Sequence, residues 1–174
     1  MEYLWAPWRM EYVTGDKAAG CILCAAPDAP EEAGAFVLYR GEHNYVLLNR
    51  FPYNSGHLMV VPYEHLRHLT DLSPAQVAEM MEIAQGVVEA FGQCLRPEGV
   101  NLGMNLGQAA GAGIDDHLHL HLVPRWSGDT NFMTAAGDTR VVPQSLEACA
   151  AQIGPVLREV MQRRRCGTPP DQAE

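Results

Sequence analysis

The chain has 174 residues, of which 47% are hydrophobic and 19% are charged, and its formal net charge is −9. This length and composition fit one soluble domain with its own core, and the acidic excess argues against nonspecific binding to nucleic acid, which requires Lys and Arg. No apolar run reaches the roughly 20 residues of a membrane-spanning helix and no secretory signal opens the chain, so we expect a cytoplasmic protein without membrane partners.

Two cysteines in the first part of the chain, Cys21 and Cys24, have the spacing of a metal knuckle. One such pair is only half of a four-ligand site, so the residues alone leave three interpretations open: a metal site, a pair of buried thiols and a redox pair. The redox interpretation is weakened because no strand–helix–strand pattern surrounds the pair. The chain has five cysteines, an odd number, which argues against a framework of disulfides.

Short segments rich in apolar residues predict strands on both sides of a long helix. The predicted strands are residues 36–39, 45–49, 57–61, 100–106 and 117–123. Strands, a helix, more strands and a final helix predict an α+β domain with a mainly antiparallel sheet of about five strands and two main helices. We expect a single domain over residues 1–166, followed by a disordered tail at residues 167–174.

The first long helix has a clear start. Ser73 caps it, Pro74 suits its first turn, and Gln76 completes a capping box. Apolar residues at steps of three and four then predict one apolar face, made of Val77, Met80, Met81, Ala84, Val87, Val88, Phe91 and Leu95. A second helix is predicted from Ser145 to about Arg164, with an exposed basic end.

The last predicted strand carries His117, His119 and His121. Alternate side chains of a strand share a face, so the three imidazoles would line one face while the leucines between them pack into the core. Two chemistries fit: three ligands to one metal, or one imidazole nucleophile whose neighbours orient it and supply protons. The glycine-rich segment 107–113 favours the nucleophile, because backbone N–H groups of such a segment cradle an anion.

The segment from His117 to Val123 resembles the His-φ-His-φ-His-φ-φ signature of the histidine triad (HIT) family of nucleotide hydrolases and transferases. The segment 49–62 is similar to the family's first half-site, with its asparagine and Gly-His positions. Asn105 resembles a polar residue on the strand before the triad. These matches span most of residues 21 to 132. The resemblance implies a HIT-like fold and a homodimer whose sheets join across the interface.

The resemblance also implies roles for single residues. His119 would be the nucleophile that attacks the α-phosphorus and forms a nucleotidyl-histidine intermediate, and His121 would hydrogen-bond near the scissile phosphate. His57 resembles a histidine that supports the triad from the neighbouring strand. Asn49 resembles a residue that contacts the ribose, although by itself it would suggest a turn at a strand end. The other residues expected at the nucleotide or its phosphates are Asn105, Gly111, Ala112, Gly113 and Trp126.

In several bacterial members of the family, and in related uridylyltransferases, two histidines complete a cysteine pair into a metal site. The resemblance therefore implies a structural zinc with no open position for water, held by Cys21, Cys24, His65 and His117. Such a site would attach the N-terminal segment to the back of the catalytic strand and remove His117 from the chemistry. His68 is the competing ligand. No organic cofactor is expected.

Two further segments resemble one branch of the family, which contains bacterial diadenosine tetraphosphate phosphorylases. They are residues 5–9, with Trp5 and Trp8 expected in packing, and residues 125–132, where Trp126 would order a loop over the phosphates. In that branch phosphate accepts the nucleotidyl group. The sequence departs from the pattern at residues 112–114, which lack a side-chain donor worth about 1.5–3 kcal/mol, so phosphate and water both stay open as acceptors.

The expected substrate is thus a nucleotide or dinucleoside polyphosphate, such as diadenosine tetraphosphate. Three alternatives remain from the same residues. The first is a nucleoside phosphoramidase of the same family, which cleaves P–N bonds. The second is a metal-dependent hydrolase that uses the histidine run as ligands. The third is a nucleotide-binding sensor without useful turnover.

Overall fold

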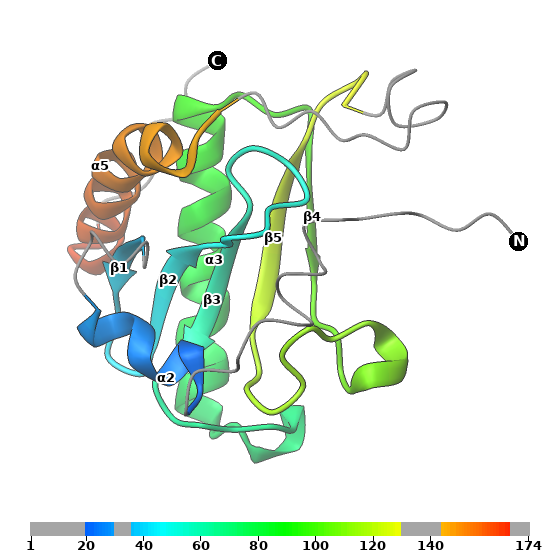
Figure 1. Cartoon of the computed structure of the whole chain (residues 1–174). Helices are drawn as coiled ribbons and strands as arrows, with labels where there is room; N and C mark the ends of the chain where they lie inside the picture. Colours follow the sequence, from blue (N-terminus) through cyan, green and yellow to red (C-terminus); the bar gives the residue numbers. More distant parts are fainter. Residues whose placement is uncertain (1–19, 30–35, 130–143, 168–174) are drawn as a thin grey trace, which may run out of the picture.

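One antiparallel sheet organises the chain (Figure 1). The computed structural model describes residues 20–29, 36–129 and 144–167. Its five strands lie in the order β1-β2-β3-β5-β4, and each neighbouring pair is antiparallel, as predicted. The strands are β1 (Val37–Arg40), β2 (Asn44–Leu48), β3 (Leu58–Pro62), β4 (Gly99–Gly103) and β5 (Leu120–Arg125).

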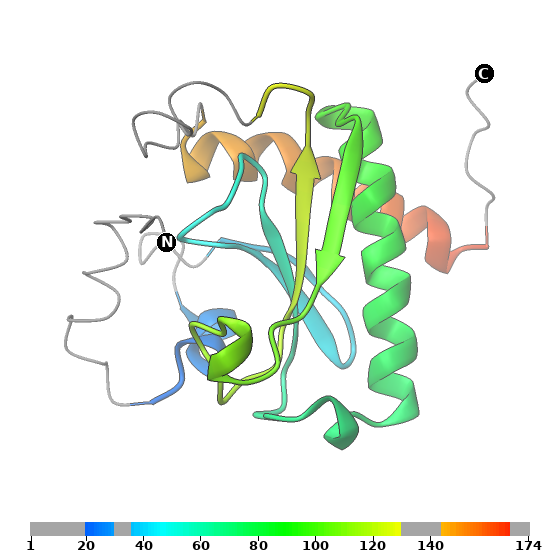
Figure 2. The same cartoon turned by 90° about the vertical axis from the view of Figure 1, so that its right-hand side faces the viewer.

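Two long helices cover one face of this sheet. The helices α3 (Pro74–Cys94) and α5 (Leu146–Arg165) share the main core with alternate strand residues such as Val60 and Leu122. The short helix α2 (Ile22–Ala25) packs on the other face, where the remaining residues of β2 and β3 form a second core. In Figure 2, α2 and α3 lie on opposite sides of the sheet. The predicted α+β class with two main helices is confirmed.

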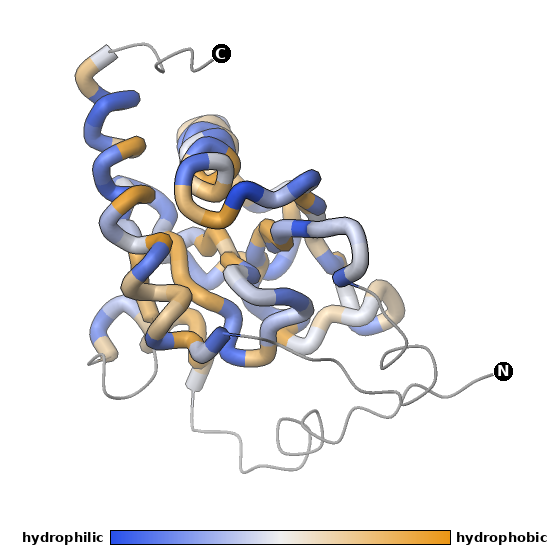
Figure 3. Tube along the Cα trace, turned by 90° about the horizontal axis from the view of Figure 1, so that it is seen from above, coloured by the Kyte–Doolittle hydropathy of each residue, from blue (hydrophilic) through white to orange (hydrophobic). Residues whose placement is uncertain are grey.

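The starts of both long helices agree with their sequence signals. The Ser73 hydroxyl accepts the N–H of Gln76, and the Gln76 side chain accepts the N–H of Ser73, which completes the predicted capping box. The Ser145 hydroxyl caps α5 by accepting the N–H of Ala148. Around the helix that leads to the C-terminal end, hydrophobic and hydrophilic residues alternate within the turns (Figure 3), as expected when one side of a helix is buried.

The predicted apolar face of α3 is too wide. Val77, Met81 and Val88 are 42%, 48% and 40% exposed, whereas Met80 is buried. At 3.6 residues per turn the three exposed side chains lie roughly 60–100° around the helix from Met80, beyond the edge of the contact with the core. Ile83, on the other side of Met80, is fully buried instead. The helix is therefore rotated relative to the prediction and leaves an apolar stripe exposed.

The basic end of α5 is less exposed than predicted. Arg163 and Arg164 both donate to Glu89 of α3, and their side chains are 25% and 29% exposed. The Arg165 guanidinium lies 5.5 Å from the centre of the Tyr39 ring. The run therefore clamps α5 onto α3 and β1, a tertiary use that the composition of a helix end does not reveal.

The strand predicted at residues 117–123 begins later than expected. His117 and His119 precede β5, because the β3–β5 ladder stops before the end of β3. That end is Pro62, which lacks an N–H for the ladder. The N–H of Leu118 donates instead to the carbonyl of Leu66, at 2.7 Å, in the segment that follows β3. The first two histidines of the run are thus fixed outside the sheet.

Several predictions for the chain ends fall outside the described residues. This applies to Trp5 and Trp8, and to the predicted tail beyond Gly167. Within the described parts, every strand belongs to the one sheet, and both cores pack against it. No helix found there has both the length and the apolar composition to cross a membrane.

Candidate active site and candidate metal centre

Three histidines meet on the sheet face opposite the long helices. His121 lies on β5, His119 just before it, and His57 just before the paired strand β3, while Leu120 and Leu122 face the helices. The Nε2 atom of His57 is 3.0 Å from Nδ1 of His121. The rings of His119 and His121 are 4.7 Å apart and nearly perpendicular. The three residues predicted as catalytic are brought together.

Burial keeps these three imidazoles neutral. It lowers the pKa of His57 to about 3 and the pKa of His121 to about 4, and the neighbouring histidines lower both further toward these values. Burial also lowers the pKa of His119, against the opposing effect of its bond to a backbone carbonyl. A neutral imidazole has one N–H and one free lone pair, so each ring offers one donor nitrogen and one acceptor nitrogen.

His119 keeps the lone pair of Nε2 free. Its Nδ1 atom lies 2.8 Å from the carbonyl oxygen of His117, which can only accept, so the proton resides on Nδ1. The side chain is 6% exposed. An unprotonated ring nitrogen of this kind is a nucleophile toward phosphorus near neutral pH. The geometry therefore suits the role expected for His119.

Asn49 follows β2 directly and takes part in the turn that leads to His57. Its Oδ1 atom accepts the N–H of Phe51 at 2.9 Å, and its Nδ2 atom lies 3.3 Å from Nδ1 of His57. The backbone N–H of Tyr53 donates to the same Nδ1 atom at 3.0 Å. The residue expected at the ribose thus also touches the histidine group.

A cavity of about 400 Å³ lies beside His121. It is lined by β4, β5 and the turn before β3, and its polar side chains include Tyr53, Asn105 and Arg125. Arg125 is the one Arg or Lys among its described lining residues, and Asp129 balances this charge through bonds of 2.6 and 2.9 Å. The cavity is a polar space of a size that suits a phosphate or sugar group.

Sequence reasoning did not single out Tyr53 or Asp129. The Tyr53 ring lies 4.7 Å from the ring of His57. The Asp129 carboxylate accepts hydrogen bonds from the side-chain amide of Asn54 at 2.9 Å and from the backbone N–H of Trp126 at 3.2 Å. It therefore organises the loop after β5. Trp126 itself is half-buried and is not among the described residues that line the cavity. The only sequence signal for both missed residues was their place in segments that carry the family resemblance.

The glycine-rich segment 107–113 forms a short loop before the triad. Gly107 and Gly111 have φ of 83° and 84°, a backbone region that favours glycine. The N–H groups of Gly111 and Ala112 donate to carbonyls inside the loop, at 2.9 and 3.4 Å. In this conformation those two groups are not available to a phosphate. The expected anion cradle at these positions would need the loop to change its bonds.

Asn105 connects this loop to the sheet. Because β4 ends at Gly103, Asn105 follows the strand and does not lie on it as expected. Its side-chain amide donates to the carbonyl of Gly111 at 3.4 Å, and it also lines the cavity beside His121. Gly113 is exposed near the end of the loop. The phosphate-binding roles predicted for Asn105 and Gly113 stay predictions.

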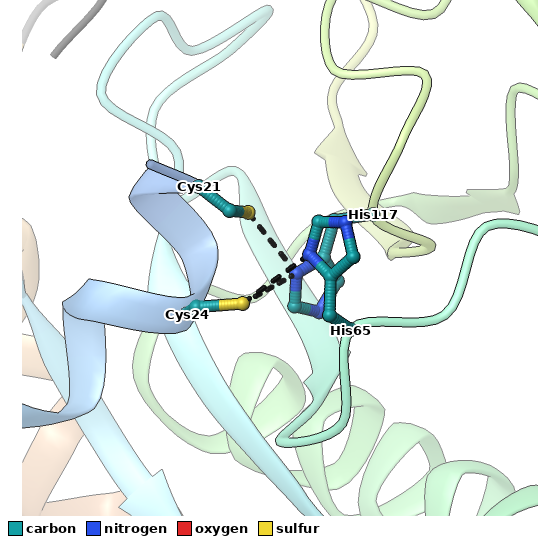
Figure 4. A group of neighbouring side chains, drawn as sticks. All are labelled: Cys21, Cys24, His65 and His117. Carbon is teal, nitrogen blue, oxygen red and sulfur yellow. Dashed lines mark hydrogen bonds between the residues drawn. The ribbon is translucent and has the colours of Figure 1, made fainter. Parts of the chain in front are cut away.

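A second cluster lies behind the first histidine of the run (Figure 4). One ligand atom from each of its four residues lies within 4.8 Å of the others. The distance from Nδ1 of His117 is 3.2 Å to the sulfur of Cys21 and 3.5 Å to that of Cys24, and Nδ1 of His65 is 3.3 Å from the Cys24 sulfur. The four residues are those predicted for the metal site.

The donor set fits a tetrahedral metal of the zinc type. Zn–S and Zn–N bonds of about 2.3 and 2.0 Å give tetrahedral edges of about 3.5 Å, close to the spacings found here. Nε2 of His117 donates to the carbonyl of Pro62 at 3.0 Å, so its Nδ1 lone pair faces the sulfurs. His68, the competing ligand, instead caps the short helix that begins at Leu69.

The positions of the histidines argue against one metal bound by the whole run. Among the described residues, the group able to hold a metal includes His117 but neither His119 nor His121. His117 turns toward the cysteines because it precedes the sheet, where the strand alternation does not apply. Its ring contacts the ring of His65 at 5.1 Å. The run is divided between two sites.

Comparison with known sequences gives consistent matches. The HIT domain matches residues 30–128 of the chain. The chain is 39% identical over 155 residues to a protein of Mycobacterium tuberculosis named AP-4-A phosphorylase, a match that covers 84% of this chain and 79% of that protein.

Solved structures show the same architecture. A Zn-bound histidine triad family protein from Mycobacterium smegmatis superposes with a TM-score of 0.65 at 31% identity, over 82% of this chain and 96% of that one. A hypothetical histidine triad nucleotide-binding protein from Sulfolobus tokodaii gives a TM-score of 0.65 at 23% identity, over 88% of this chain and all of that one, and supports the fold alone.

Proposed function

This chain belongs to the HIT domain family, and from that premise we propose that it transfers a nucleotidyl group from dinucleoside polyphosphates, such as diadenosine tetraphosphate, through an intermediate on His119. The observation that carries the proposal is the neutral, buried imidazole of His119, whose Nδ1–H is held by a carbonyl while Nε2 keeps its lone pair. The similarity to the AP-4-A phosphorylase of M. tuberculosis supports the choice of substrate.

The reaction proceeds in two displacements at phosphorus. Nε2 of His119 attacks the α-phosphorus of diadenosine tetraphosphate; a P–N bond forms, the P–O bond breaks, and ATP leaves as an anion. An acceptor oxygen then attacks the same phosphorus, the P–N bond breaks, and the imidazole is restored. Phosphate as acceptor gives ADP, and water gives AMP. The group that leaves in the first step and the group that enters in the second step occupy the same side of the phosphorus, opposite His119. One pocket therefore serves both steps.

We propose phosphate as the acceptor. The support is the name of the M. tuberculosis relative, together with the polar cavity beside His121, which has room for a phosphate. Arg125 lines this cavity; its Nε and one N–H of each terminal nitrogen donate to Asp129 and Asn101, which leaves one N–H on each terminal nitrogen for a phosphate. The missing side-chain donor at residues 112–114 does not remove these donors, because they come from another element of the fold.

Product analysis tests the function and the acceptor together. The protein is incubated with diadenosine tetraphosphate, with and without phosphate, and the nucleotides are separated by anion-exchange chromatography. We expect ADP and ATP in equal amounts when phosphate is present. AMP and ATP in both conditions would make water the acceptor. If neither pair appears faster than with the His119→Asn variant, the protein does not catalyse this reaction.

We also propose a structural zinc. Cys21, Cys24, His65 and His117 would hold it, and the Zn-bound M. smegmatis neighbour supports this metal. Four protein ligands leave no position for water, so the ion supplies a cross-link between α2 and the two histidine segments. Elemental analysis of the purified protein tests it, and about one zinc per chain is expected, falling in a Cys24→Ser variant.

A homodimer is the proposed assembly. β4 forms one edge of the sheet, most of its residues are exposed, and Leu102 on it is 45% exposed. The apolar stripe of α3 described above adds exposed Val77, Met81 and Val88. A second copy that pairs with β4 would extend the sheet and cover apolar surface. Light scattering is expected to give twice the chain mass, and a Leu102→Lys variant should lower it.

A further inference from the structure

We infer that Asn49 is a positioning residue that acts through His57 on His121, in addition to any contact with the ribose. Its side-chain amide and the N–H of Tyr53 both face Nδ1 of His57, so the proton of His57 is on Nε2. That N–H faces Nδ1 of His121, so the proton of His121 is on its own Nε2. The inference rests on the proposed function for its effect on catalysis, and on the hydrogen bonds of the described residues for its structural content.

The first step concerns the orientation of the Asn49 amide. Its Oδ1 atom accepts the N–H of Phe51 at 2.9 Å, so the oxygen end of the amide faces the turn. The NH₂ end is therefore the one that faces Nδ1 of His57, at 3.3 Å. Exchanging the two ends of the amide would place the NH₂ group against the N–H of Phe51, donor against donor.

The second step concerns His57. Its Nδ1 atom faces two donors, the amide of Asn49 and the backbone N–H of Tyr53 at 3.0 Å, so it must accept. The side chain is 0% exposed. Burial lowers its pKa to about 3, which excludes the doubly protonated ring near neutral pH. A neutral ring that accepts at Nδ1 carries its one proton on Nε2.

The third step concerns His121, whose protonated nitrogen follows from that of His57. Nε2–H of His57 donates to Nδ1 of His121 at 3.0 Å, so the proton of His121 is on its own Nε2. His119 has the opposite arrangement, with its proton on Nδ1. The two adjacent rings thus differ in kind: His119 offers a lone pair to phosphorus, and His121 offers an N–H to an oxygen of the reacting phosphate. Such a donor stabilises the charge that develops on that oxygen.

The backbone holds this arrangement in place. Gly56, between the donors and His57, has φ of 77°, and a Cβ there would lie 2.8 Å from Cδ1 of Leu95. The N–H of His57 donates to the carbonyl of Asn54 at 3.1 Å. The turn is therefore tight, and it holds the imidazole against both donors.

A pair of variants at Asn49 separates positioning from ribose binding. Asn49→Asp keeps an oxygen for the ribose hydroxyls but puts an acceptor in front of Nδ1, which opposes the native proton on His57. Asn49→Ala removes the ribose contact, but the N–H of Tyr53 still donates to Nδ1 of His57 and keeps the proton of that ring on Nε2. Positioning predicts a lower kcat for Asn49→Asp than for Asn49→Ala, by about tenfold, the worth of one hydrogen bond. A role in ribose binding alone predicts a higher KM for Asn49→Ala than for Asn49→Asp, with similar kcat values for the two variants.

Nitrogen-15 NMR of the ligand-free protein gives a readout that does not depend on turnover. We expect Nε2 of His121 to be protonated and Nδ1 unprotonated in the native protein, and this pattern to weaken in Asn49→Asp but not in Asn49→Ala. Thermal melting of each variant shows whether it is folded. A proton on Nδ1 of His121 in the native protein overturns the inference, and so does a kcat of Asn49→Asp equal to or above that of Asn49→Ala.

The two proposals fail separately. If the native protein cleaves no dinucleoside polyphosphate but shows the expected ring protons and their response to Asn49→Asp, the proposed function is wrong and the proton arrangement is supported. If it cleaves the substrate through His119 while Asn49→Asp leaves kcat and the ring protons unchanged, the function stands and Asn49 has no positioning role.

Discussion

His117 and His119 stand two residues apart in the chain, yet their imidazoles face different sites with opposite nitrogens. His117 donates Nε2–H to the carbonyl of Pro62 and turns the lone pair of Nδ1 toward Cys21. His119 donates Nδ1–H to the carbonyl of His117 and keeps the lone pair of Nε2. In both rings a backbone carbonyl accepts a hydrogen bond from one ring nitrogen, and the position of that carbonyl decides which nitrogen keeps its lone pair. The main chain thus assigns the chemistry of each side chain.

The largest expected effect separates the two regions from the catalytic side. His119→Ala should lower the rate of nucleotidyl transfer by about 10⁴-fold or more, because it removes the nucleophile. Metal content and melting temperature should stay close to those of the native protein. His43→Ala, in the turn between β1 and β2, is the matched control and should keep full activity. A His119→Ala protein that retains a tenth of the rate would place the nucleophile elsewhere.

The metal side should show the converse. Cys24→Ser, or removal of the metal with a chelator, should lower the melting temperature by roughly 6–12 °C, corresponding to about 3 kcal/mol of lost stabilisation. The rate at temperatures where the variant is folded should fall less than about tenfold, since no ligand touches phosphorus in the proposed reaction. Calorimetry and the product assay measure the two quantities. Loss of activity equal to that of His119→Ala, without a change in melting, would contradict the separation.

A smaller effect appears when the pH is lowered. The pKa of His57 is lowered by burial to about 3 in the folded protein, against about 6.5 in an unfolded chain. Between these values the unfolded chain binds the extra proton, so the free energy of unfolding decreases as the pH falls, by up to about 1.4 kcal/mol per pH unit. Urea unfolding at several pH values measures the slope. His57→Gln cannot titrate, and should give a flatter dependence.

The smallest expected effect lies far from both regions. Glu89→Gln weakens the partly exposed ion pairs with Arg163 and Arg164. It should lower stability by about 1 kcal/mol or less and leave activity and metal content unchanged. Urea unfolding and the product assay check both statements. A marked loss of activity would show that the α3–α5 contact affects the histidine sites, and that the core and the sites are not independent.

The sequence predicted the features that depend on local pattern. The capping box at Ser73 and the buried leucines of the triad segment follow from spacing alone, and the structure has both. The residues proposed as metal ligands and as catalytic histidines came from the family resemblance, and the fold brings each group together. The local features and the grouping of these residues could be predicted because neighbouring residues, or a motif shared with the family, carried the information.

The features that the sequence did not predict depend on contacts between distant segments. The start of β5 after His119 depends on where the paired strand β3 ends, at Pro62. The width of the buried face of α3 depends on which of its side chains contact the sheet and α5. The role of Asp129 depends on Asn54, which is 75 residues away in the chain. Periodicity and composition contain no information about such partners.

One amide connects both regions and can report on them. The backbone N–H of Leu118 lies between His117, a proposed metal ligand, and His119, the proposed nucleophile. It donates to the carbonyl of Leu66 at 2.7 Å, and the Leu118 side chain is buried. This N–H can exchange with solvent hydrogen only when its bond to Leu66 breaks and the segment separates from the loop after β3. Its exchange rate should therefore rise when the metal is removed and remain unchanged in His119→Ala, which makes one backbone proton a sensor for the join between the two sites.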